Sequence, residues 1–180
     1  MPISIVPIFI ILPPIFAVKV FHDTTGTIYS YLLASAGVGG ILGGLVLTVL
    51  RRYEHWGRLQ MAAIFMLSVT FVSFSFNTNV YLAYGLMALA GFFEIFFLST
   101  NITSIQLSIP DNVRAKVTAA ITLSIIFNPV GSMIAGAGAD LLGPKEITWV
   151  LCAIGFLTAI GFYAFSPAIR NFRLSQNMGG

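Results

Sequence analysis

Six long apolar stretches, separated by short polar segments, make up almost the whole chain. They cover residues 3–18, 28–50, 59–76, 80–105, 117–142 and 147–165. A helix needs about 20 predominantly apolar residues to cross the hydrocarbon core of a bilayer, and most of these stretches are long enough. The pattern predicts an all-α membrane protein whose six transmembrane helices occupy residues 1–166, followed by a tail over residues 167–180.

The six stretches form two similar sets of three. The second and fifth are rich in glycine, the third and sixth are uniformly apolar, and the first and fourth carry prolines or polar residues. This three-plus-three period predicts an inverted repeat, which in transporters places the binding site near the bilayer midplane. The third stretch, residues 59–76, has no polar side, and we expect it to face lipid all round.

Composition excludes a water-soluble fold. The 180 residues are 57% hydrophobic and 8% charged, whereas soluble domains average about 25% charged residues. A net charge of +3, without a run of Lys or Arg among aromatic residues, excludes nucleic acid as a partner. The single cysteine, Cys152, excludes an intrachain disulfide.

Motifs of intramembrane enzymes and of ATP-driven pumps are missing from the sequence. At membrane depth it has no His-x-x-x-His motif, no Ser/His pair and no Asp pair, and it has no nucleotide-binding loop. His55 has no neighbouring residues that could complete a metal site. We therefore expect no enzyme activity, no cofactor and no metal.

Basic residues mark one side of the predicted bilayer. With six spans, seven of the nine basic residues lie on one side, namely Arg51, Arg52, Arg58, Arg114, Lys116, Arg170 and Arg173. The other side carries only Lys19 and Lys145. Because short loops rich in Lys and Arg stay in the cytoplasm, we expect both termini and the tail to be cytoplasmic.

One carboxylate, Glu94, lies in the middle of an apolar stretch. A charge at the bilayer centre costs roughly 2.5–3.5 kcal/mol or more, so such a residue normally faces a protein interior or a watery cavity. On a helix, Glu94 shares one face with small or polar residues, namely Ala83, Met87, Ala90 and Asn101. We expect this face to point inward.

A similar stripe follows one face of the fifth stretch. Small or polar residues recur there at helical spacing: Ser124, Asn128, Ser132, Ala135 and Ala139. Pro129 interrupts the helical hydrogen bonds beside Asn128. We expect Asn101 and Asn128 to offer hydrogen bonds to a bound molecule.

Glycines in the second and fifth stretches predict close helix packing. Gly40 and Gly44 are four residues apart, as are Gly39 and Gly43, and this spacing lets helix backbones approach each other. Gly136 adds a small position in the fifth stretch. A cavity-lining or hinge role is the alternative interpretation of these glycines.

Three segments carry a family resemblance. They read LPPIFA over residues 12–17, NITSIQLSIPDNVRAKV over residues 101–117 and PVGSMIAGAGADLLG over residues 129–143. These segments are similar to the end of the seventh helix, to the tenth helix with the cytoplasmic loop after it, and to the eleventh helix of major facilitator superfamily (MFS) transporters. The resemblance is to the bacterial branch of enterobactin-exporter-like proteins and transmembrane secretion effectors.

The resemblance implies one half of a larger carrier in the bacterial inner (plasma) membrane. Full MFS transporters have twelve helices, so six helices correspond to the C-terminal half, and the N-terminal half would be missing from a fragment. A homodimer of six-helix units is the alternative. By the same resemblance, Arg58, Asp111 and Arg114 belong to the cytoplasmic gate, although the loop over residues 51–58 lacks the Asp of the family's gating motif.

The function implied by the resemblance is efflux of a small molecule by a multi-pass secondary transporter, an antiporter that exchanges it for protons. Glu94 would bind a cationic group of the cargo or a proton, or else it would link to a polar residue of a neighbouring helix. The expected partners are the lipid bilayer, the N-terminal half or a second copy, the cargo and protons. The alternative function is that of a membrane assembly subunit that does not transport.

Overall fold

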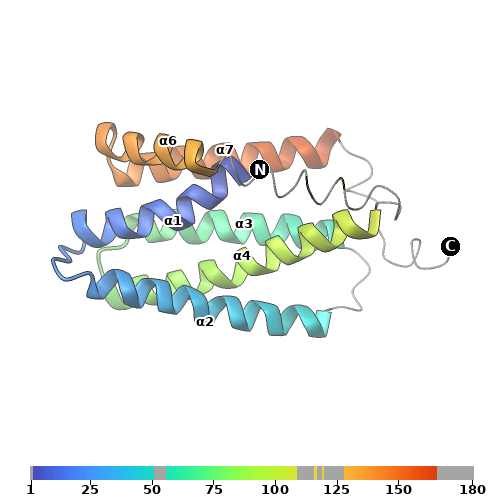
Figure 1. The fold of residues 1–180 in the computed structure, drawn as a ribbon, viewed down its shortest axis with the longest axis horizontal. Coiled ribbons are helices and arrows are strands. Elements are labelled where there is room, and N and C mark those ends of the chain that lie inside the picture. Colours follow the sequence, from blue (N-terminus) through green and yellow to red (C-terminus); the bar gives the residue numbers. More distant parts are fainter. Residues whose placement is uncertain (1, 51–55, 109–115, 117–118, 120–127, 166–180) are drawn as a thin grey trace.

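The computed structural model describes residues 2–50, 56–108 and 128–165, together with residues 116 and 119. Its helices lie side by side along one long axis (Figure 1). They are α1 (Pro2–Lys19), α2 (Thr27–Val49), α3 (Trp56–Phe76), α4 (Val80–Ser108), α6 (Asn128–Leu141) and α7 (Pro144–Phe165). Within these ranges the chain is all-helical, as predicted, and contains no strand. Helix is the expected form because an apolar stretch in lipid must satisfy its own backbone hydrogen bonds.

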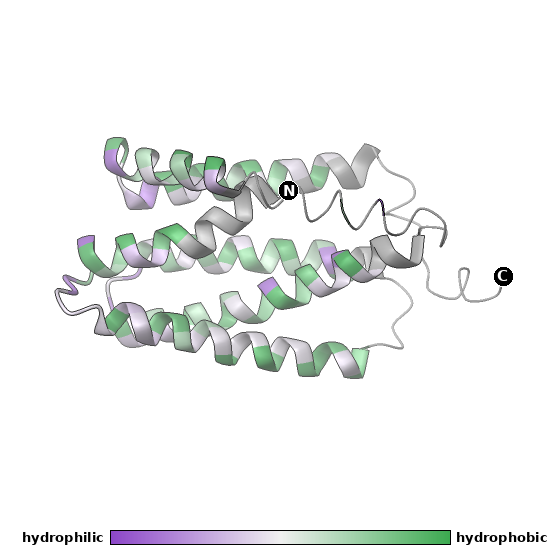
Figure 2. Cartoon of the chain, viewed as in Figure 1, coloured by the Kyte–Doolittle hydropathy of each residue, from purple (hydrophilic) through white to green (hydrophobic). Residues whose placement is uncertain are grey.

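Three of the described helices are long and apolar enough to cross a membrane, over Thr27–Val49, Leu59–Phe76 and Val80–Thr103. Hydrophobic residues cover most of the helix bodies, and hydrophilic residues gather at the end where the α1–α2 and α6–α7 turns lie (Figure 2). These observations indicate a membrane protein. The total of six spans stays a prediction. The predicted tail and the predictions for residues 109–127 lie almost entirely outside the described residues.

Small turn residues end the helices. Gly26 and Gly143 adopt positive φ values of 76° and 103° at the α1–α2 and α6–α7 turns, a conformation that glycine adopts without strain. Asn79 precedes α4, and its side-chain oxygen accepts a hydrogen bond from the backbone N–H of Tyr81 at 2.9 Å. This bond satisfies one of the free N–H groups at the helix start.

The helices pack as two groups joined by α3. Helix α2 packs most extensively against α4, and α4 also packs against α3. Helix α1 packs against α6 and α7, and α7 contacts α3. Near one end, the rings of Phe16 in α1 and Phe74 in α3 lie 5.1 Å apart between their centroids, and both side chains are fully buried. Figure 1 shows α3 in the middle of the bundle.

The expectation that residues 59–76 face lipid all round is wrong. One side of α3 is buried in the bundle, including Ala63, Ile64, Leu67, Thr70, Phe71, Phe74 and Ser75. Trp149 of α7 also donates a hydrogen bond to the Ser75 hydroxyl at 2.7 Å. A uniformly apolar helix gives no contrast between its sides, so hydropathy alone could not show which side is packed.

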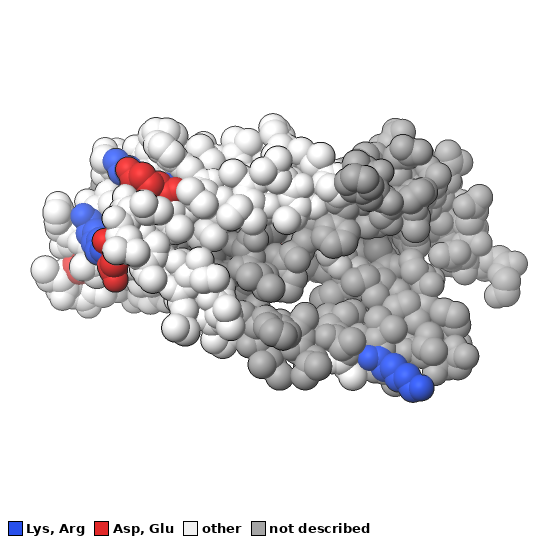
Figure 3. Space-filling model, turned by 90° about the horizontal axis from the view of Figure 1, so that it is seen from above, with Lys and Arg blue, Asp and Glu red and all other residues white. Residues whose placement is uncertain are grey.

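Charged side chains gather at one end of the described part of the molecule, and basic side-chain atoms also lie at the other end (Figure 3). At the crowded end, Lys19 Nζ of α1 lies 2.8 Å from Asp140 Oδ1 of α6. Both side chains are substantially exposed, so this ion pair contributes about 0–1 kcal/mol at most. Its main effect is to join the ends of α1 and α6.

Asp23 organises the turn that begins α2. Its Oδ1 accepts hydrogen bonds from the backbone N–H groups of Thr25 (3.1 Å) and Gly26 (2.8 Å), and its Oδ2 accepts one from the N–H of Tyr29 (3.0 Å). Burial alone would raise the pKa of this carboxyl, but these bonds and one from the Thr25 hydroxyl hold its pKa below the usual value. The ionised carboxylate is therefore the form that stabilises the turn.

We predict that Asp23 gives the protein acid-sensitive stability. Because the folded-state pKa lies below the unfolded value of about 3.9, the stabilisation is present above that pH and is lost as the pH falls through the folded-state value. Asp23→Asn should lower the thermal midpoint in detergent at pH 7 and flatten its dependence on pH below 4. Glu146→Gln is the control and should keep the wild-type dependence of the thermal midpoint on pH. If the midpoint depends on pH equally weakly in the wild type and in Asp23→Asn, the assignment is contradicted.

Candidate functional site

Helices α2 and α4 touch through their backbones. A Cβ atom added at Gly39 would overlap the carbonyl oxygen of Ala88, and one added at Gly91 would overlap that of Ala36. A Cβ at Gly43 would lie 2.5 Å from the carbonyl oxygen of Phe92. This approach is possible only with glycine at these positions, and it fixes the two helices against each other.

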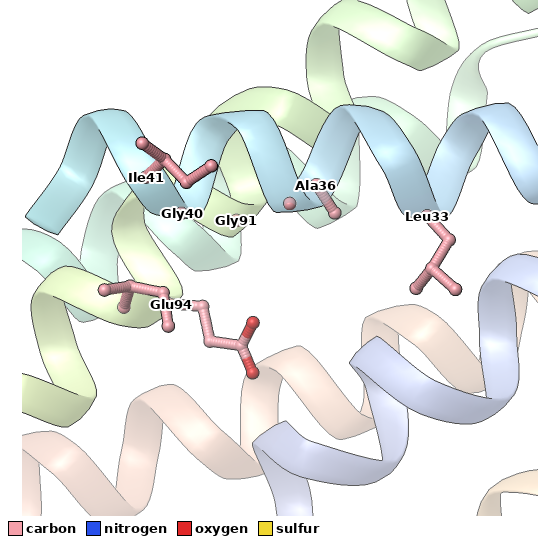
Figure 4. Close-up of a pocket in the computed structure, with 8 residues that line it drawn as sticks. Leu33, Ala36, Gly40, Ile41, Gly91 and Glu94 are labelled. Atoms are coloured by element: carbon pink, nitrogen blue, oxygen red, sulfur yellow. The ribbon is translucent and has the colours of Figure 1, made fainter.

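Beside this contact, the same two helices enclose an open, mostly apolar pocket of about 560 Å³ (Figure 4). Such a volume falls within the range of small-molecule sites, roughly 300–1,000 Å³. Its described lining comes from α2 and α4: Leu33, Ala36, Gly37, Gly40, Ile41, Gly91, Glu94 and Ile95. One side chain in this set, Glu94, is polar.

Glu94 projects from α4 into the gap between α2 and the helices opposite (Figure 4). Its side chain is partly buried, and it makes no hydrogen bond or ion pair with any residue that the structure describes. A carboxylate without a partner in an apolar span carries the cost of roughly 2.5–3.5 kcal/mol or more noted above. An arriving proton or cation would remove that cost.

The inward stripe of α4 is confirmed. Ala83, Met87 and Ala90 are at most 1% exposed, and Asn101 on the same face is partly buried. Asn101 lies two helical turns beyond Glu94, about 10 Å along the axis, and it does not line the pocket. The structure thus puts the two predicted polar residues on one helix face without bringing them into one site.

The remaining predicted site residues lie at the edges of the described chain or beyond it. Arg58 falls in the first turn of α3 and Asn128 begins α6, but their side chains are outside the described set. Asp111 and Arg114 are outside the described residues altogether. On α6, Ala135 and Ala139 of the predicted stripe are buried.

The predicted packing glycines have different surroundings. Gly40 lines the pocket, and a Cβ there would lie 3.0 Å from a side-chain atom of Ile95. A Cβ at Gly44 or Gly136 would meet nothing within 4 Å. The close backbone contact falls instead on Gly39 and Gly43, the other pair with the same spacing, and on Gly91 of α4, as described above.

Binding is the chemistry that this pocket can perform. Among the described residues, no group of three His, Cys, Asp or Glu side chains could hold a metal ion. The part of its lining that the structure describes includes neither a nucleophile nor a second acid that could work together with Glu94. A single carboxylate in an apolar wall can hold and release a positive charge.

Comparison with known proteins agrees with a membrane carrier. The family model for transmembrane secretion effectors of the MFS matches residues 4–175. The chain is 25% identical over 130 residues to the staphyloferrin A transporter of Staphylococcus aureus, in a match that covers 72% of this chain and 32% of that protein. The chain therefore matches about a third of the length of that relative. No solved structure gives a significant match. From the near-complete family match, we conclude that the chain belongs to the transmembrane secretion effector family of MFS transporters.

Proposed function

We propose that the chain is a six-helix unit of a secondary transporter that exports a small molecule in exchange for protons. The observation that carries the proposal is Glu94, a carboxylate in the middle of a span that has no partner among the described residues and faces a pocket of suitable size. Ionisable residues inside membrane spans typically mark substrate or proton pathways. Protonation and cargo binding at the same carboxylate would exclude each other, which is the basis of exchange.

The helix packing supports an inverted three-plus-three repeat. In such a repeat, α1 corresponds to α4, α2 to α6 and α3 to α7. The α2–α4 contact then has its counterpart in the α1–α6 contact, and the α3–α4 contact has its counterpart in the α1–α7 contact. The α3–α7 contact maps onto itself. Within the described residues, the α1–α2 and α6–α7 contacts have no equally extensive counterparts, so the symmetry is partial. An inverted repeat of this kind would give six spans with both termini in the cytoplasm, and we propose that the Glu94 site lies near the midplane.

The proposed transporter needs a second bundle of helices. Since the chain matches about a third of its curated relative, that bundle would come from an N-terminal half or from a second copy in the bacterial inner membrane. The similar protein from Staphylococcus aureus is named as a staphyloferrin A transporter, which supports a transport function for this chain. Asn101 and Asn128 would hydrogen-bond the cargo, and Arg58, Asp111 and Arg114 would brace the cytoplasmic gate.

An accumulation assay tests this function. Cells that overproduce the protein should accumulate less of at least one compound in a panel of fluorescent amphipathic molecules than cells with an empty vector. A protonophore should abolish the difference, because exchange for protons stops when the gradient collapses. Unchanged accumulation of every compound would favour a non-transporting assembly subunit, and a difference that survives the protonophore would contradict proton coupling.

A further inference from the structure

We propose that the α2–α4 pocket selects cargo that carries one positive charge on a bulky apolar body, and that Gly37 sets the size limit of that body. This inference rests on the proposed function, because it names the class of molecule that the same site takes. Charge and shape support it independently.

The charge of the cargo follows from Glu94. No lysine or arginine is among the lining residues that the structure describes, and the Lys19–Asp140 ion pair lies at the crowded end of the bundle, in helices other than α2 and α4. Along this described wall, an anionic cargo would meet a carboxylate that no described cation compensates. A cargo rich in neutral polar groups would leave them without hydrogen bonds against the apolar wall. A single cation neutralises Glu94, and its apolar body is received by the wall around it.

The shape of the cargo follows from the α2 wall. Leu33 and Ile41 supply large apolar surfaces, whereas Ala36, Gly37 and Gly40 between them have at most a methyl group. Space is available at Gly37, because a Cβ there would meet nothing within 4 Å. A bulky group can therefore rest directly on the α2 backbone beside the carboxylate, at a position where an added Cβ would not meet α4.

Two ions of the same shape and opposite charge test the charge requirement. The protein, purified in detergent from its host membranes, should bind tetraphenylphosphonium saturably in equilibrium dialysis, and tetraphenylborate should not compete. Glu94→Gln should weaken tetraphenylphosphonium binding at least about tenfold, whereas Glu146→Gln should not change it. Equal competition by tetraphenylborate, or unchanged binding by Glu94→Gln, would overturn the inference.

A pair of glycine variants tests the size limit. Gly37→Leu should weaken tetraphenylphosphonium binding at least about tenfold while changing tetrapropylammonium binding less than about threefold. Gly44→Leu is the matched control, since this glycine is in the same helix, has equally free surroundings and does not line the pocket. Unchanged binding of both ions by Gly37→Leu would contradict the size limit, as would equal losses in the two variants.

The binding assays test the cargo class, and the accumulation assay tests the proposed function, so the two proposals can be rejected independently. If tetraphenylphosphonium binds through Glu94 but no compound is exported, the cargo class stands and the proposed function fails. If proton-dependent export is present but the cation does not bind at Glu94, the proposed function stands and the cargo class fails.

Discussion

Replacing Glu94 by Gln is expected to reduce export at least about 25-fold. The substitution keeps the size and shape of the side chain but removes its charge, so it can no longer hold a cation or exchange it for a proton. Losing one member of a desolvated charge pair costs about 2–5 kcal/mol, and each 1.4 kcal/mol is about tenfold. The measurement is the initial rate of efflux from preloaded cells, with the amount of protein in the membrane determined on the same samples.

The matched control is Glu146→Gln, because Glu146 lies in the exposed first turn of α7 and outside the pocket. This variant should export at the wild-type rate. Glu94→Asp should recover part of the activity, since it restores the charge one methylene group further from the cargo. Wild-type efflux by Glu94→Gln would reduce Glu94 to a packing role and would remove the basis of the proposed mechanism.

Of the Gly→Ala substitutions proposed here, Gly39→Ala is expected to destabilise the protein most. The new methyl would overlap the Ala88 carbonyl, a backbone atom that cannot rotate away, so α2 and α4 must separate. Overpacking of this kind costs about 1–3 kcal/mol, occasionally more, which exceeds the roughly 1 kcal/mol gained from the better helix propensity of alanine. The thermal midpoint in detergent, followed by size-exclusion chromatography of heated samples, should therefore fall.

Gly91→Ala should also lower the midpoint, by a smaller amount, because its methyl would overlap the Ala36 carbonyl from the α4 side of the contact. Gly44→Ala should leave the midpoint unchanged or raise it, since nothing lies within 4 Å of the added atom. A stable Gly39→Ala protein with wild-type retention would show that the two helices do not meet at this backbone contact.

The buried side of a helix could be predicted where one face differs in residue type from the rest of the helix. The stripe through Ala83, Met87 and Ala90 stood out against the large Leu and Phe side chains around it, and all three residues are buried. Helix α3 offered no such contrast. Its packed side was missed because its lipid-facing and protein-facing residues are equally apolar, and only the positions of α1, α4 and α7 determine which side is covered.

The glycine contact illustrates a second limit. Gly39/Gly43 and Gly40/Gly44 have the same spacing and differ by about 100° around the helix. Either pair could have faced α4, and the choice depends on the rotation of the whole helix. The pocket was also beyond sequence reasoning, because its walls combine residues of α2 and α4 that are some 50 positions apart in the chain. Glu94 could be singled out because a charge among apolar residues is a local signal.

The central claim is that Glu94 faces a water-accessible passage, and cysteine labelling tests it most directly. In a Cys152→Ser background, Glu94→Cys should react with a small, charged, membrane-impermeant thiol reagent applied to the cells. Leu89→Cys is the control, since Leu89 is 45% exposed and lies about 140° around α4 from Glu94, where we expect lipid. Fast labelling at position 94 and none at position 89 is the predicted result. If neither position reacts, whichever side of the membrane the reagent is applied to, the claim is contradicted.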